Sequence, residues 1–151
     1  MSDSEKRSPV RLERVHLHET FANVETPERL PADATVWLEM DTATWRALDP
    51  ERAEVILGFE FDLSTPDEAE LPCSIAASFR LLYQMGPIES IEERRRFCAT
   101  RALRDAWPYW RGYLSQTLTL MGVDPLHLPP QPPGDAVRAT QEAFDLSLTT
   151  S

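Results

Sequence analysis

The chain has 151 residues, of which 42% are hydrophobic and 26% are charged, and its formal net charge at pH 7 is -10. This length predicts one domain with a core of its own, so neither disulfides nor a structural metal is required. No apolar run approaches the roughly 20 residues of a membrane-spanning helix, and the charged start of the chain does not read as a signal peptide. We therefore expect a cytoplasmic protein without direct membrane insertion.

The negative charge is concentrated in the first half of the chain. Between Glu19 and Glu70, fourteen acidic residues stand against three arginines, a net of -11, whereas the stretch from Ile88 to Gly112 has a net of +2. An acidic half repels phosphate backbones, which argues against nucleic-acid binding. It favours a basic partner, although an acidic surface often serves solubility alone.

The chain opens with a polar stretch, residues 1–9, that we expect to be disordered. An imperfect alternation over 10–24 then predicts a strand. Val15, Leu17 and Phe21 share one phase of this strand. The opposite phase of the apolar residues before Glu13 predicts a bulge there.

Three more strands are predicted, over 35–44, 53–64 and 71–83. The middle one has the clearest alternation, with apolar residues in one phase and acids in the other. Short turns between the strands predict antiparallel pairing of consecutive strands. The alternation predicts a sheet with one solvated face and one covered face. Trp37 falls in the phase of the acids, so we expect it to be exposed or to lie in an interface.

The second half of the chain predicts the helical cover. Ser90 and Glu93 fit a capping box at a helix start, and Gly122 fits a C-terminal cap. Pro108 predicts a kink or a break near residues 105–107. Apolar residues recur at helical spacing between these caps. They are Ala99, Leu103, Trp107, Trp110, Leu114, Leu118 and Met121.

Five prolines between residues 123 and 134 predict a stiff extended loop, and the apolar spacing after it predicts a short last helix. The whole pattern predicts an α+β fold. A four-stranded antiparallel sheet has a long helix, kinked or broken, and a short C-terminal helix packed on one face. One domain would cover 10–148, and 149–151 would form a tail.

Motifs of enzymes and metal sites are missing from the sequence. It has no nucleophile elbow, phosphate-binding loop or dinucleotide fingerprint. His16 and His18 would point to the same strand face and could begin a metal site, but no third ligand is fixed, so surface histidines are the better interpretation. Cys73 and Cys98 lack a neighbouring base and read as free, buried thiols in a reducing compartment. We expect no catalytic residue, cofactor or metal.

The order of these elements and several local strings resemble the SecB family of export chaperones. The strings are Glu54-Val55-Ile56-Leu57 at the start of the third strand, Pro108-Tyr109 followed by Arg111, and Gly122 followed by Pro125-Leu126-x-Leu128-Pro129. The resemblance covers roughly residues 10–144.

The resemblance implies a chaperone that holds unfolded or preprotein clients without ATP and that assembles as a dimer or as a tetramer of two dimers. Clients of the family lie in apolar grooves beside the second strand, the helix-connecting loop and the last helix. The matching residues in this chain are Leu30, Pro31, Val36, Leu38, Met40, Leu126, Leu128, Val137 and Phe144.

The resemblance also implies an acidic outer sheet face that meets a partner, in the family the SecA motor. Glu19 matches one acid of that family face, but Ser74 replaces another, and the C-terminal tail is not acidic. These departures weaken the link to SecA and leave open a role with other partners, for example in a toxin–antitoxin system. The partner-facing acids expected here are Glu19, Glu39, Asp41, Glu60 and Asp62.

Three hypotheses follow from the sequence. The first is a chaperone whose exposed apolar grooves are kept soluble by acidic charge. The second is an adaptor that recognises one partner through the acidic sheet face. The third, an enzyme or small-ligand pocket between sheet and helix, ranks last because no residue constellation supports it.

Overall fold

The computed structural model describes the backbone of residues 10–24, 35–64, 73–123 and 128–150, with all side chains except those of 24 and 145–150. The sheet consists of β1 (Arg11–Val24), β2 (Thr35–Asp49), β3 (Arg52–Ser64) and β4 (Cys73–Gln84). The predicted α+β class, with its four-stranded antiparallel sheet, is confirmed. The stretch expected to be disordered, residues 1–9, lies outside the described residues.

The strands lie in the order β1-β4-β3-β2. Pairing of consecutive strands is confirmed for β2 with β3 and for β3 with β4, but it is wrong for β1, which pairs with β4. Only two residues separate β2 from β3, so these strands must be neighbours, whereas ten residues separate β1 from β2 and allow β1 to pair with the free edge of β4 instead. Strand β2 also runs five residues past its predicted end, since its turn begins only where Asp49 accepts the N–H of Glu51 at 2.7 Å.

A bulge divides β2 into two segments. The pairing with β3 shifts by one residue between Met40 and Thr42, so Met40 and Ala43 both point to the covered face. The extra residue, Asp41, places its carboxylate against the Cα of Gly58, where a Cβ atom would collide with it. A glycine in the middle of a strand often marks such a close approach.

Replacing Gly58 with alanine tests this constraint. We expect Gly58→Ala to lower the free energy of unfolding by about 1–3 kcal/mol, because the bulge must move to make room for the methyl group. Gly112→Ala is the matched control, since nothing lies within 4 Å of a Cβ at that helical position. Urea denaturation measures both, and equal stabilities for the two variants would contradict the role of Gly58.

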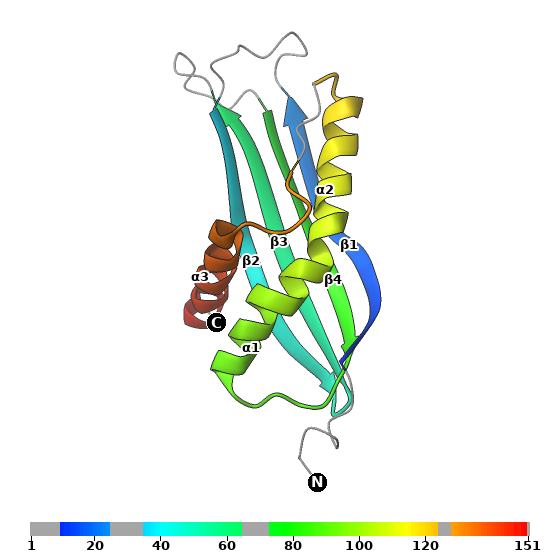
Figure 1. Cartoon of the computed structure of the whole chain (residues 1–151), viewed down its shortest axis with the longest axis vertical. Helices are drawn as coiled ribbons and strands as arrows, with labels where there is room; N and C mark the ends of the chain where they lie inside the picture. The colour runs from blue at the N-terminus through cyan, green and yellow to red at the C-terminus, as the bar shows by residue number, and fades with distance from the viewer. Residues whose placement is uncertain (1–9, 25–34, 65–72, 124–127, 151) are drawn as a thin grey trace.

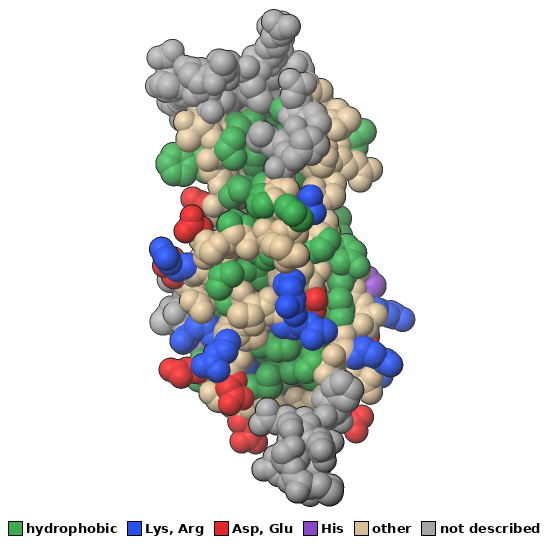
Figure 2. Space-filling model, viewed as in Figure 1, with side chains coloured by type: hydrophobic (Ala, Val, Ile, Leu, Met, Phe, Trp, Pro, Cys, Tyr) green, Lys and Arg blue, Asp and Glu red, His purple; other side chains and the backbone are tan. Residues whose placement is uncertain are grey.

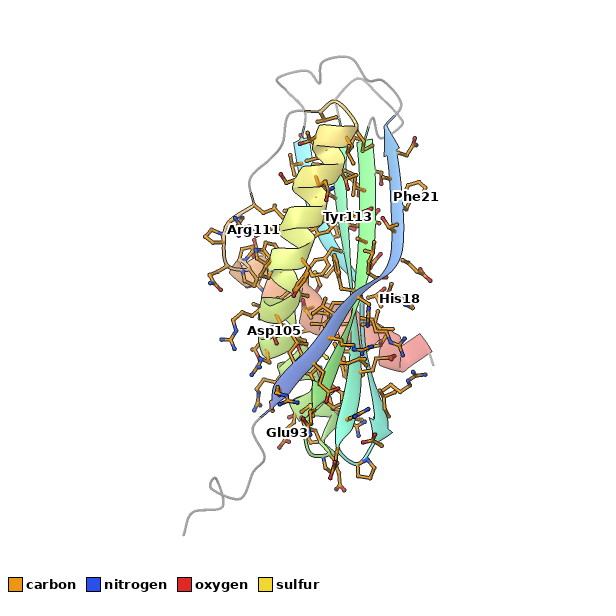
Figure 3. The ribbon with its side chains drawn as sticks, turned by 90° about the vertical axis from the view of Figure 1, so that its right-hand side faces the viewer. His18, Phe21, Glu93, Asp105, Arg111 and Tyr113 are labelled. Atoms are coloured by element: carbon orange, nitrogen blue, oxygen red, sulfur yellow. The ribbon has the colours of Figure 1, made fainter. Side chains whose placement is uncertain are left out.

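Strand β1 has two register shifts against β4. The shift between Leu12 and Arg14 confirms the predicted bulge. A second shift, between Leu17 and Glu19, was not predicted, and it moves Phe21 out of the phase of Val15 and Leu17. Phe21 therefore points away from α2 on the outer face (Figure 3), and its predicted placement with these residues is wrong.

The helices cover the other face of the sheet. The first helix begins with α1 (Ile91–Phe97), passes through the π-helical segment η2 (Cys98–Ala102) and continues as α2 (Leu103–Leu120), which crosses the sheet (Figure 1). The expected apolar stripe is buried along it, and Met121 at its end is half-buried. The sequence predicts a kink or a break at Pro108. Pro108 lies inside the continuous helix α2, so the helix is not broken there, and the α-helical pattern is interrupted earlier, by the π segment.

Both predicted caps of this long helix are confirmed. The Oγ atom of Ser90 accepts the N–H of Glu93 at 3.4 Å. At the other end, Gly122 has φ 78°, and the N–H of Val123 reaches the carbonyl of Leu118 at 2.9 Å. A left-handed residue that is followed by such a bond ends a helix in a Schellman motif.

The last helix, α3 (Gly134–Thr150), packs mainly against β2 and runs along the outer edge of that strand (Figure 1). An edge strand that is covered by a helix is protected from pairing with other chains. Within the described parts of the chain, no helix is long and apolar enough to span a membrane.

Candidate functional site

A hollow of about 190 Å³ lies between β2, α2 and α3. Leu38 and Met40 of β2 form one wall, with Glu39 at the rim. The opposite wall comes from the start of α3 and the residue before it. These residues are Pro133, Asp135, Ala136 and Ala139. Apolar side chains gather in the middle and upper part of the molecular face on which α2 and α3 lie (Figure 2).

The floor of the hollow is aromatic. Phe59 projects from β3, and Trp107 and Trp110 project from α2. The rings of Phe59 and Trp110 stack with centroids 5.2 Å apart, and Trp107 meets Phe59 at 6.1 Å in an edge-on arrangement. Rings packed in this way are held rigidly and offer apolar area without loss of side-chain freedom on binding.

The apolar surface continues from the hollow along β2. Val36 and Leu38 are 41% and 43% exposed although they point to the covered face of the sheet. Met40, the next residue in the same phase, is half-buried. An exposed apolar strip that continues into a hollow is typical of a binding surface.

The other residues expected in the client groove are placed differently. Leu128 and Val137 are half-buried and pack against the core. Phe144 is only 2% exposed and belongs to the core cluster. It therefore anchors α3 to the core and does not line the hollow. Leu30, Pro31 and Leu126 lie outside the described residues.

Sequence reasoning did not assign the aromatic floor to the site. Trp107 and Trp110 belong to the apolar stripe of the helix, and such a stripe predicts core residues. They are core residues, 2% and 1% exposed, and they also face the hollow. Only the Trp-Pro-Tyr-Trp cluster, with two large aromatic rings one turn apart on one helix face, was a signal that this part of the core is unusual.

The outer face of the sheet brings the predicted acids together. Glu39 and Glu60 are direct cross-strand partners, and Asp41 lies two residues further along β2, at the bulge. Burial raises the pKa of Glu60 above its ordinary range, and the neighbouring charges of Asp62, Asp41 and Glu39 raise it further. Glu19, on β1, lines a separate hollow of the outer face together with Asp41.

Two of these acids, Glu60 and Asp62, are less solvated than the alternation predicted, whereas Glu19, Glu39 and Asp41 are exposed. Asp62 is 7% exposed and accepts a hydrogen bond from the Oγ of Ser74 at 2.6 Å. Trp37 is its cross-strand partner, and the indole N–H of that residue donates to the Oγ of Ser64 at 3.0 Å. Since Trp37 is half exposed, the prediction that it is either exposed or in an interface is consistent with this position.

Neutralising Glu60 should stabilise the protein. Because its pKa is raised, the folded chain binds the proton more tightly than the unfolded chain, and stability falls as pH rises from the ordinary carboxyl range through the raised value. We expect Glu60→Gln to raise the free energy of unfolding at pH 7 by up to about 1 kcal/mol, the scale of one like-charged cross-strand pair.

Urea denaturation at pH 7 and at about pH 4, where free carboxyl groups begin to protonate, measures the effect. The gain should shrink at the lower pH and in high salt. Glu142→Gln, on the exposed side of α3, is the control. A gain that is the same at both pH values would show that Glu60 is not strained by its acidic neighbours.

The thiols of Cys73 and Cys98 and the hydroxyl of Tyr83 belong to buried core residues. Burial raises the pKa of Cys98 to about 12, and burial together with the charge of Asp62 raises the pKa of Cys73. Burial likewise raises the pKa of Tyr83, whose hydroxyl donates to Asp105 at 2.9 Å. Thiols with a raised pKa are poor nucleophiles. In the part of the chain that the structure describes, no three His, Cys, Asp or Glu side chains are grouped to hold a metal ion.

Comparison with solved structures shows a similarity of fold. No family model and no curated protein matches the chain. The SecB-like chaperone Rv1957 of Mycobacterium tuberculosis, in complex with a ChAD peptide from the Rv1956 HigA1 antitoxin, matches with a TM-score of 0.66 and 20% sequence identity, over 83% of this chain and 92% of that chain. A protein of unknown function from Streptococcus agalactiae has a TM-score of 0.43 and 10% identity, over 80% of this chain and 97% of that chain.

The chain therefore has the fold of a SecB-like chaperone, as its sequence resemblance implied. The edge strand β2, the long helix and the last helix frame the hollow within that fold.

Proposed function

We propose that this protein is a chaperone that binds extended apolar segments of unfolded or preprotein clients in the hollow between β2, α2 and α3. Binding needs neither ATP nor a catalytic step. The observation that carries the proposal is the exposed strip of Val36 and Leu38, which continues into a hollow with an aromatic floor. Burying one such side chain against a client contributes about 1.5–3 kcal/mol, so a few contacts give useful affinity.

Charge explains how such a surface stays soluble. The net charge of -10 opposes non-specific aggregation, while the apolar strip remains available to clients. This combination, an apolar groove on a strongly acidic molecule, is what a holding chaperone requires.

Two polar substitutions test the groove. We expect Val36→Gln together with Leu38→Gln to weaken binding of an unfolded client by roughly tenfold or more, because two apolar side chains no longer lose contact with water on binding. Both side chains are partly exposed, so the fold should persist. Light scattering of an aggregating client, measured without nucleotide, reports the holding activity.

Leu48→Gln is the matched control for this test. Leu48 is 41% exposed on the same strand but lies outside the hollow. The control should suppress aggregation as well as the unaltered protein does. Equal activity of the groove variant and the control would place client binding elsewhere on the molecule.

A binder dedicated to one partner is the second candidate. The Mycobacterium tuberculosis chaperone with this fold was solved with a peptide from an antitoxin, which favours a partner of that kind for this chain too. Several unrelated unfolded proteins bound with similar affinity would support the general chaperone, whereas tight binding of a single peptide would support the dedicated one. Delivery of clients to the SecA motor in the cytoplasm stays a prediction of the sequence.

We also propose that the protein works as a dimer or as a tetramer of two dimers. Among the described strands, β1 forms the sheet edge that no helix covers, and Leu17 on it is half exposed. An uncovered edge of this kind pairs readily with a second copy. Multi-angle light scattering at micromolar concentration should give at least the mass of a dimer, and Leu17→Arg should lower that mass. A monomer from the unaltered protein would refute the assembly.

A further inference from the structure

Two side chains of α2 hold the segment that leads into α3. We call this segment, residues 128–133, the strap. The indole N–H of Trp107 donates to the carbonyl of Pro129 at 2.7 Å, and the Nε of Arg111 donates to the carbonyl of Leu128 at 3.2 Å. Four of the six strap residues are proline and have no N–H, so regular backbone pairing cannot fix the strap, and side-chain donors take that role.

Trp107 serves two structures at once. Its ring forms part of the aromatic floor of the hollow, and its N–H holds the strap. The strap passes directly into the first turn of α3, where the N–H groups of Ala136 and Val137 both reach the carbonyl of Pro133, at 2.9 and 3.3 Å. Pro133 and Ala136 belong to the wall opposite β2, so the position of the strap fixes the position of that wall.

Burial is uneven along α3. Thr140, Ala143 and Phe144 are buried, which anchors the middle of the helix. The first turn is less covered, since Asp135 is exposed, and Ala136 and Val137 are only half-buried where they pack against the core. The first turn therefore has fewer core contacts than the middle of the helix, and its position depends on the strap as well as on the core.

We infer that Trp107 and Arg111 are positioning residues that set the width of the client hollow by holding the strap. With both bonds formed, the first turn of α3 stays close to β2 and the hollow is narrow. Loss of these bonds frees the first turn, while the core contacts keep the rest of α3 in place, and the hollow opens. This inference rests on the proposed function for its meaning, but the structural part of it can be measured without any client.

The two bonds are unequal. The Trp107 bond is short and its side chain is buried, whereas the Arg111 bond is longer and its side chain is only half-buried. Water competes less for a buried hydrogen bond. Loss of the Trp107 donor should therefore have the larger effect.

The test compares Trp107→Phe with Trp110→Phe in the full chain. Both substitutions remove the same atoms from the aromatic floor, and both tryptophans pack on Phe59. Only the first removes the donor to the strap. Hydrogen exchange at the amides of Ala136 and Val137 should quicken about fivefold to tenfold in Trp107→Phe, the factor that corresponds to one lost hydrogen bond. Exchange at Ala143 and Phe144 should stay as it is.

Arg111 provides a second, milder variant. Arg111→Met removes the donor and should quicken exchange at the same two amides by a smaller factor, whereas Arg111→Lys, which keeps a donor, should restore much of the protection. Equal exchange at Ala136 and Val137 in Trp107→Phe and Trp110→Phe would overturn the inference. Denaturation with urea checks that both tryptophan variants have similar global stability.

Client binding completes the test. If the hollow must open to admit a chain, the association rate of a denatured client should rise in Trp107→Phe by a factor similar to that for exchange, because the open state is more populated. If exchange is faster but the association rate is unchanged, the inference that the strap sets the width of the hollow is also overturned. Failure of the unaltered protein to bind any client would refute the proposed function. The exchange data would still show whether Trp107 holds the strap and the first turn of α3.

Discussion

The packing of the Phe59 ring against the tryptophans of α2 is the interaction on which the rest of the structure depends. Phe59 lies in the middle of β3, where Met40 and Ala77 are its partners on the neighbouring strands. Its ring meets Phe79 in the sheet and both tryptophans of α2. The helix is thereby seated on the sheet at one defined place, and the space left beside this contact, next to β2, is the hollow.

Local patterns were sufficient to predict most elements. The alternation of β3 and β4, the apolar stripe of α2, the cap at Ser90 and the left-handed Gly122 all follow from short-range sequence rules, and all are present. The second bulge of β1 and the π segment were not predictable in this way. Their positions depend on pairing with β4 and on how α2 fits the sheet, which are contacts between residues far apart in the sequence.

The residues of the candidate site also differ in how far the sequence could predict them. Leu38 and Met40 came from the resemblance to a family and lie in the hollow, but the aromatic floor was hidden, because a tryptophan in a buried stripe has the same spacing whether or not it borders a cavity. Phe144 shows the reverse, since amphipathic spacing cannot distinguish a core contact from a groove contact. The burial of Asp62 depends on Trp37 and Ser74, which reach it from two neighbouring strands.

The prolines of the strap have a consequence for the kinetics of a bound chain. A strand-like segment beside a binding groove is ordinarily a template on which an extended client can build a hydrogen-bonded ladder. The strap offers few N–H groups, and the carbonyls of Leu128 and Pro129 are already occupied by α2. If the hollow binds clients as proposed, a client along this border is retained by its side chains and not by a backbone register. Under the proposed function, a client that lies against the strap can therefore slide and leave in small steps.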